Sequence, residues 1–344
     1  MKSQLLAWKN NLFFYFLLST LLFGMGYTFF NNVSNYLDST SDAAFYLFYI
    51  ENGFSVDEND HRGSRILVPK LVSIIYGLCN GNVGSWDSLK FSFFIINSLF
   101  LILSVAAYHK ILRIFGYSDS LIRVAAILFL SSFASANYFL RGSVDPGEIL
   151  FLAALTLTLL LNKIQLTPLI FALGMLNRET FLATGTALFF ADILYDYYWK
   201  KTPLTRLSPK LICLCLSMLA AAAAHIGVKF YITGGFSTPI DTFNKLDNLP
   251  EWQDGRSLLE ETRRFLYVFL IPTACTFFSP VKLPSRIVLH IFVMSIVVLF
   301  GSWVVSTSGT GLSRYLYSAS GFYLSLMVAS CIFRTDSTIV LKEK

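Results

Sequence analysis

Long apolar runs separated by short polar segments dominate the chain. A membrane-spanning helix needs about 20 mostly apolar residues, and by that measure the pattern predicts about ten spans. We place them at residues 11–30, 88–108, 121–140, 148–161, 168–176, 181–195, 211–232, 263–279, 286–306 and 314–333. The predicted fold class is therefore an all-α polytopic membrane protein, with residues 1–344 forming a single integral membrane domain.

The fifth predicted span is too short to cross a bilayer alone. We interpret it as one arm of a hairpin with the sixth span, with Asn177-Arg178-Glu179-Thr180 as the polar tip. Residues 31–87 form a first outer loop, in which we expect two membrane-surface helices, at residues 42–52 and 66–79. Residues 233–262 form a second outer loop.

The composition supports a membrane protein: 55% of residues are hydrophobic and 14% are charged, against about 25% charged residues in soluble domains. The net charge of +6 does not indicate a nucleic-acid partner, since no soluble segment carries a basic stripe with interleaved aromatic residues. The five cysteines lie mostly in apolar runs and show neither a disulfide framework nor metal-ligand spacing.

Lysine and arginine mark the side of the membrane on which short loops lie. The short loops predicted to lie on the same side of the membrane as the N-terminus are mostly basic and include Lys110, Lys200, Lys201, Lys210 and Arg286. We therefore expect both termini in the cytoplasm of a bacterial cell and the two long loops on the periplasmic or outer face of the inner membrane.

With this topology, charged residues from five distant parts of the chain fall at the outer face. They are Asp42, Arg62, Arg65, Arg141, Asp145, Glu148, Arg178, Glu179 and Arg314. Ionisable groups in or near a membrane are costly and usually face protein or a wet cavity. Because the guanidinium fork binds two phosphate oxygens at once, the set suggests a cavity for an anionic, lipid-borne substrate.

Each of these residues also has a purely structural interpretation. Asp42 is either a general base or a charge that favours the start of its helix. Asp145 and Glu148 fit the N-cap and N3 positions of the next span, with Pro146 between them. Arg178 and Glu179 are either a structural pair or a phosphate-binding arginine oriented by a carboxylate.

The remaining candidates are more peripheral. Arg141 and Arg314 also suit interfacial anchors. The four histidines, His61, His109, His225 and His290, show no spacing that suits a metal site.

The order of these motifs resembles the GT-C superfamily of multi-spanning glycosyltransferases. The resemblance lies in Asp42 after the first span, Arg65-x-x-x-Pro69, Arg141-Gly-Ser-Val-Asp145-Pro, Leu176-Asn-Arg178-Glu179-Thr and Ser313-Arg314-Tyr315. It implies transfer of a sugar from a polyprenyl-phosphate carrier to a glycan, lipid or protein acceptor, in cell-surface glycan biosynthesis. It further implies Asp42 as the general base and Arg65, Arg178 or Arg314 as donor-phosphate ligands, with Arg62, Arg141, Asp145 and Glu179 also in the substrate site.

No cofactor is expected: the acidic residue nearest to Asp42 is Asp38, and no paired acidic motif supports a divalent metal. The activity would be that of a hexosyl- or pentosyltransferase. Two other classes stay open on the sequence alone. An O-antigen-type polymerase or ligase would use a pyrophosphate-linked oligosaccharide, and a transporter or flippase of lipid-linked glycans would perform no chemistry. Transporters typically place polar residues near the bilayer midplane and show inverted repeats, whereas here most of the charge falls at one face.

Overall fold

The computed structural model of the chain describes residues 13–24, 42–51, 65–79, 83–84, 87–132, 135, 144–233, 274, 277–305 and 312–332. Within its helices, the side chains of residues 42–44, 233, 298–305 and 312–316 lie outside the described part. Every regular element of the described part is a helix, which confirms the predicted all-α class.

The described chain begins with the helix Phe13–Gly24. It continues with α2 (Asp42–Glu51), α3 (Leu67–Cys79), α4 (Ser88–Ile114), α5 (Asp119–Leu130), α6 (Asp145–Leu160), the short 3₁₀ helix η3 (Ile164–Leu166), α7 (Thr167–Asn177), α8 (Thr180–Tyr198), α9 (Leu204–Thr233), α12 (Ser285–Val305) and α13 (Leu312–Ile332). The two helices predicted in the first outer loop correspond to α2 and α3, and the predicted hairpin corresponds to α7 and α8. The second outer loop and most of the span predicted at residues 263–279 lie outside the described residues.

Local sequence accounts for several helix boundaries. Asp87 caps α4, its carboxylate accepting from the backbone N–H groups of Leu89 and Lys90 at 2.9 and 3.0 Å. Ser118 caps α5 in the same way through the N–H of Leu121. Gly116, with φ +86°, supplies the left-handed turn between these two helices.

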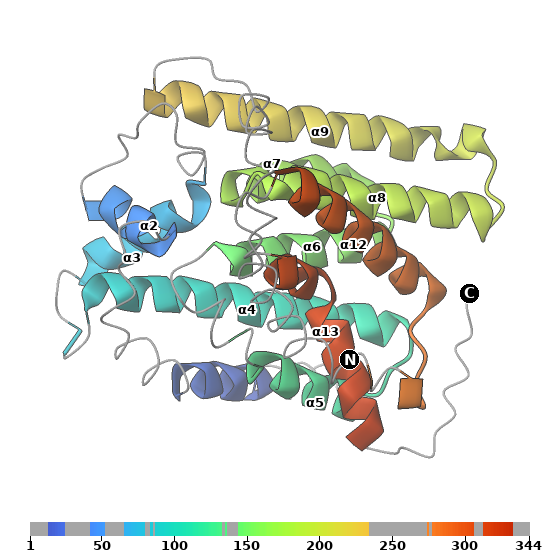
Figure 1. Ribbon diagram of the computed structural model, residues 1–344, viewed down its shortest axis with the longest axis horizontal. Helices are drawn as coiled ribbons and strands as arrows, with labels where there is room; N and C mark the ends of the chain where they lie inside the picture. The colour runs from blue at the N-terminus through green and yellow to red at the C-terminus, as the bar shows by residue number, and fades with distance from the viewer. Residues whose placement is uncertain are drawn as a thin grey trace, which may run out of the picture.

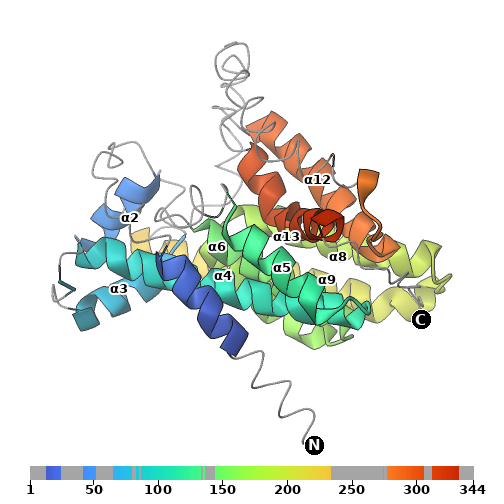
Figure 2. The same ribbon diagram turned by 90° about the horizontal axis from the view of Figure 1, so that it is seen from below.

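The long helices α4, α8 and α9 all run along the longest axis, with α6 packed against α4 and α8 packed against α9 (Figures 1 and 2). α2 and α3 lie together at one end of this bundle, which we call the α2–α3 end (left in Figure 1). The connection from α8 to α9 lies at the opposite end, the α8–α9 end. α12 packs against α8, and α13 packs against α5.

Three apolar clusters hold these helices together. One joins α4, α5 and α13, where the rings of Tyr108 and Phe322 stack with centroids 4.7 Å apart. A second joins α6, α7, α8 and α9 around Phe171 and Phe181. The third fixes α2 and α3 on the first part of α4. The α2–α3 end is therefore attached to the bundle by its own apolar contacts.

A buried polar network holds the α8–α9 end. Asp192 of α8 is fully buried and accepts from Lys210 Nζ of α9 at 2.6 Å and from Arg286 Nε of α12 at 2.7 Å. His290 Nε2 of α12 lies 3.3 Å from the same carboxylate. Lys210 also binds Asp196 at 2.6 Å. Lys210 and Arg286, interpreted from sequence as markers of basic loops, are thus helix residues in buried ion pairs.

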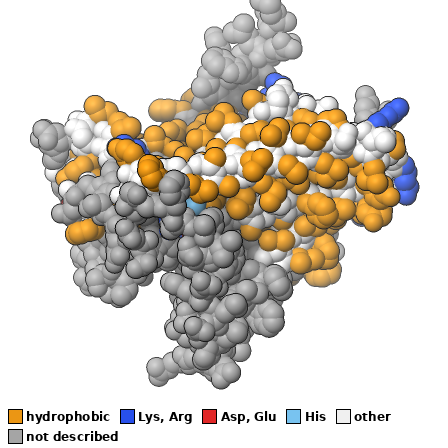
Figure 3. Space-filling view, turned by 90° about the horizontal axis from the view of Figure 1, so that it is seen from above, with side chains coloured by type: hydrophobic (Ala, Val, Ile, Leu, Met, Phe, Trp, Pro, Cys, Tyr) orange, Lys and Arg blue, Asp and Glu red, His pale blue; other side chains and the backbone are white. Residues whose placement is uncertain are grey.

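Two described helices, α4 and α9, are long and apolar enough to cross a membrane, while the other apolar helices are shorter over their described residues. Figure 3 shows hydrophobic side chains across the face that carries α9, with Lys and Arg side chains at the α8–α9 end. Leu216, Leu219 and Tyr231 are among the exposed apolar residues of this helix. These features fit contact with lipid, and the arrangement of about ten spans stays a prediction.

The Asp192 network predicts the consequence of removing its carboxylate charge. Asp192→Asn leaves the buried cations of two other helices without their anion, a change that typically costs about 3–5 kcal/mol. We expect a clear drop in the midpoint of thermal unfolding in detergent. The control is Asp119→Asn, whose side chain is 45% exposed and whose ion pairs are worth no more than about 1 kcal/mol. Equal midpoints for both variants would contradict this account.

Candidate functional site

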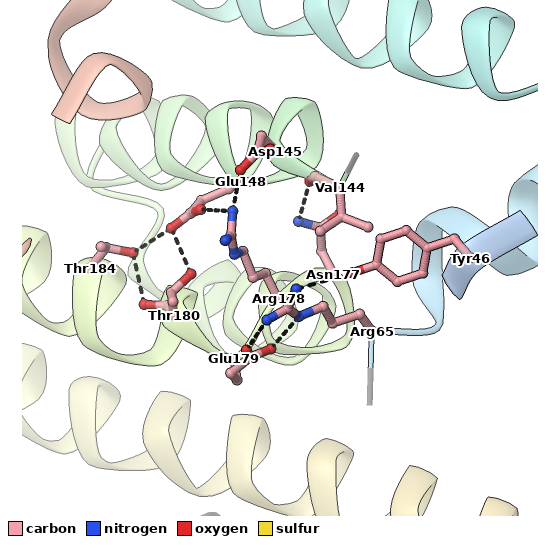
Figure 4. A network of polar contacts seen from close by, with 10 residues as sticks. All are labelled: Tyr46, Arg65, Val144, Asp145, Glu148, Asn177, Arg178, Glu179, Thr180 and Thr184. Atoms are coloured by element: carbon pink, nitrogen blue, oxygen red, sulfur yellow. Dashed lines mark hydrogen bonds and ion pairs between the residues drawn. The ribbon is translucent and has the colours of Figure 1, made fainter. Parts of the chain in front are cut away.

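The candidate site is a set of ion pairs at the α2–α3 end, where α6 and α8 begin and α7 ends (Figure 4). Its residues come from four regions: α2, the two residues before α3, the start of α6, and the tip between α7 and α8 with the first turns of α8. Sequence analysis predicted that charged residues of these regions share one side, and the structure brings several of them into direct contact.

Arg178 is at the centre of the set. It follows the last residue of α7 in an extended backbone conformation, and its side chain points toward α6 (Figure 4). Only 1% of the residue is exposed. Its Nη1 donates to Asp145 Oδ1 and lies 3.7 Å from Glu148 Oε2. A guanidinium this deeply buried requires anionic partners, because an unpaired buried charge costs several kcal/mol.

The predicted capping role of Asp145 and Glu148 is wrong. The N-cap of α6 is Val144, which makes no side-chain cap, and Asp145 is the first residue inside the helix. Both carboxylates belong instead to the Arg178 network. An N-cap contributes about 1 kcal/mol, less than the cost of leaving Arg178 unpaired, so the tertiary contact prevails over the local one.

Hydrogen bonds fix the rest of the α6 contact. Glu148 Oε1 accepts from Thr180 at 3.2 Å and from Thr184 at 3.3 Å, both on α8. Asn177 Nδ2 donates to the Val144 carbonyl at 2.9 Å. A side chain on Gly147 would collide with this amide, since a Cβ there would lie 2.0 Å from Asn177 Oδ1. Glycine at this position therefore permits the close approach of α6 and α7.

Glu179 connects the same tip to the first loop. Its carboxylate accepts from Arg65 Nε at 2.8 Å and also from Arg65 Nη2. Arg65 Nη1 in turn donates to the Tyr46 hydroxyl at 3.1 Å. Arg65 lies just before α3 and Tyr46 lies in α2, so one guanidinium joins both loop helices to the α7–α8 tip.

The electrostatics of Glu179 follow from this bidentate pair. Burial alone would raise the pKa of its carboxyl, but the Arg65 guanidinium and its hydrogen bonds outweigh burial and lower the pKa from 4.5 to about 2. The pair therefore stabilises the fold fully above pH 4.5. That contribution is lost as the pH falls from 4.5 towards 2.

The structure thus brings together Arg65, Asp145, Arg178 and Glu179 of the predicted site residues, together with Glu148. Arg62 and Arg141 lie outside the described residues. Asp42 begins α2 and Arg314 lies in the first turn of α13, but their side chains are not among those described. Tyr46 and Thr184 were not anticipated, since nothing in an apolar helical run distinguishes a tyrosine or threonine that will meet a charge from distant sequence.

The charge balance limits what this network does chemically. Among its described side chains, the two guanidinium groups of Arg65 and Arg178 face three carboxylates. Both arginines are engaged by protein anions, which makes them well suited to hold segments in place. No group of three metal-binding side chains occurs within the described residues.

The network predicts unequal effects for its two carboxylates on α6. Asp145→Asn removes the anion that contacts Arg178 directly, and we expect a loss of about 3–5 kcal/mol in unfolding free energy. Glu148→Gln retains an oxygen for Thr180 and Thr184 and leaves Arg178 paired with Asp145, so its unfolding should stay within about 1 kcal/mol of wild type.

Thermal or denaturant unfolding in detergent measures both variants. Adding Arg178→Gln to Asp145→Asn should recover part of the loss, because directly paired residues couple by about 0.5–3 kcal/mol. Additive losses in the double variant would show that Arg178 and Asp145 do not depend on each other.

Comparison with known proteins adds no family to this description: no family model, no curated protein and no solved structure matches the chain.

Proposed function

We propose that this chain is an integral membrane glycosyltransferase that moves a sugar from a polyprenyl-phosphate carrier to an acceptor at the outer face of a bacterial inner membrane. The observation that carries the proposal is the buried network that ties α2 and α3 to α6 and the α7–α8 tip. Precise charge placement at one end of an apolar helical bundle suits a reaction on a substrate whose tail is lipid and whose head is polar.

The support for a lipid-borne substrate comes from the surface around the network. α9 ends at the α2–α3 end, and its outward side chains are apolar and exposed (Figure 3). A polyprenyl chain would lie against such a surface with little loss of hydrophobic contact, leaving its phosphate and sugar at the polar end of the helices.

Asp42 is the proposed general base. It is the first residue of α2, one turn before Tyr46, and Tyr46 is fixed by its bond to Arg65. In the reaction, the acceptor hydroxyl gives its proton to the Asp42 carboxylate and its oxygen forms a bond to the anomeric carbon of the sugar. The bond from that carbon to the phosphate oxygen breaks, and polyprenyl phosphate leaves as the anion.

The leaving phosphate requires positive charge. Since Arg65 and Arg178 already bind carboxylates, we assign phosphate binding to Arg62, Arg141 and Arg314. Arg62 and Arg141 lie three and four residues before Arg65 and Asp145 in the sequence. Donors placed for the developing charge lower the barrier for its departure. Arg65, Asp145, Arg178 and Glu179 then act as positioning residues.

The proposal predicts that Asp42→Asn lowers sugar transfer by about 10²–10⁴-fold, the usual contribution of a general base. The assay measures release of polyprenyl phosphate from a panel of polyprenyl-phosphoryl sugars by the reconstituted protein, with extracted membranes as the source of acceptor. The control is Asp57→Asn, from the acidic part of the same loop, and it should retain wild-type turnover.

Full activity of Asp42→Asn would remove Asp42 from the role of base while leaving the class of reaction intact. A wild-type protein that releases no carrier phosphate, yet moves a lipid-linked glycan across proteoliposomes, would instead overturn the enzyme assignment in favour of a transporter.

A further inference from the structure

One face of α9 carries polar side chains one or two helical turns apart, all buried: Ser217, His225 and Lys229. Ser217 meets Thr167 at the start of α7, their hydroxyl oxygens 2.8 Å apart. Along the chain, α7 follows α6 and precedes α8, and both of those helices begin at the α2–α3 end. α7 therefore returns toward that end, and α9 runs in the same direction (Figure 1).

This parallel register places the outer part of α9 beside the candidate site. His225 follows Ser217 by eight residues, as Met175 follows Thr167, so equal rise along two parallel helices places His225 near the level of Met175. By the same count, Lys229 falls near the level of Glu179, just past the end of α7. The electrostatic interaction of His225 with both Lys229 and Glu179 agrees with this register.

His225 is unusual among the buried polar residues of α9. It is 4% exposed, and neither of its ring nitrogens has a hydrogen-bond partner in the described part of the chain. Ser217, on the same face, is fully satisfied by Thr167 and by the Cys213 carbonyl at 2.7 Å. Buried polar atoms almost always have partners, so an imidazole lacking both indicates a ligand group that supplies them.

The chemistry of the neighbourhood selects the ligand. A neutral imidazole offers one donor and one acceptor, which matches sugar hydroxyl groups because each hydroxyl both donates and accepts. A phosphate dianion only accepts, so it would leave the acceptor nitrogen of a neutral imidazole without a partner. The side chain of Glu179 keeps 23% exposure, whereas those of Arg178 and Asp145 keep 2% and 1%. The accessible side of the network is therefore the side on which Glu179 lies.

We propose that His225 binds the sugar of the donor, donating to one hydroxyl group and accepting from another on the α9 side of Glu179. This inference rests on the proposed glycosyl transfer and adds to it a sugar-recognition residue distinct from the base and from the phosphate ligands.

The first arm of the test separates ligand binding from a structural role. His225→Leu replaces an imidazole that lacks partners with an apolar side chain of similar size. The melting temperature in detergent should stay the same or rise, since no hydrogen bond of the protein is lost. The control Ser217→Ala, which removes a satisfied hydroxyl from the same face, should lower it. A lower melting temperature for His225→Leu would assign His225 a structural role and overturn the proposal.

The second arm measures ligand binding as a thermal shift, using polyprenyl phosphate alone and polyprenyl-phosphoryl glucose, galactose and mannose as probes. We expect at least one sugar-bearing lipid to stabilise wild type beyond polyprenyl phosphate alone. His225→Leu should lose that sugar-dependent increment, with at least tenfold weaker affinity, and keep the shift caused by the phosphate lipid. Ser217→Ala should keep both.

The outcomes are distinguishable. If His225→Leu keeps the full sugar increment, the role of His225 is wrong while the proposed function stands. If neither the bare carrier nor any sugar-bearing lipid shifts wild type, the proposed function fails, and the assignment of His225 fails with it.

Discussion

A guanidinium buried between helices is the constraint on which the α2–α3 end depends. Arg178 is 1% exposed and sits where α6 begins and α7 ends. Its charge is tolerable because Asp145 binds it directly, with Glu148 Oε2 3.7 Å away, so α6 is held at one register against the α7–α8 tip. The close contact of Gly147 with Asn177 follows from the same packing. Because Arg178 points toward α6, its neighbour Glu179 is left to bind Arg65 and, through it, the first loop (Figure 4).

α8 links the two ends of the molecule. Glu179 immediately precedes it, and Asp192, near its other end, pairs with Lys210 of α9 and Arg286 of α12. Each end is fixed by buried ion pairs, and the segment between them is packed with aromatic and aliphatic side chains. A site that must hold several groups in place is more precise on such rigid helices than on loops alone. The proposed reaction therefore draws its geometry from the bundle, while its reacting groups lie on segments attached to it.

The sequence predicted the helices better than it predicted their contacts. Apolar run length placed the start of α4 at Ser88, and a charged tip inside an apolar run identified the α7–α8 hairpin. The sequence placed Arg65, Asp145, Arg178 and Glu179 in one group, and the structure brings these four residues into one network. These successes share a physical basis, because burial of apolar surface and the cost of unpaired charge both leave a pattern in linear sequence.

The failures concern pairing between distant segments. Asp145 fits a local capping pattern, and nothing near it in sequence indicates that its carboxylate will pair with Arg178. Asp192 lies inside an apolar run. Its partners Lys210 and Arg286 flank apolar runs, as basic loop residues also do, so the sequence did not distinguish the two roles. His225 drew attention only as one of four scattered histidines. Its unpartnered ring nitrogens become informative once α7 and α9 are seen to run in parallel.

The most direct test of the central claim is a structure of the protein in a lipid nanodisc with a polyprenyl-phosphoryl sugar bound. The account predicts a polyprenyl chain along the apolar helices, the phosphate near Arg62, Arg141 or Arg314, and the sugar between Asp42 and the Glu179–His225 side of the network. A carrier head group bound at the α8–α9 end, or a ligand lying along the middle of the bundle away from α2 and α3, would contradict it.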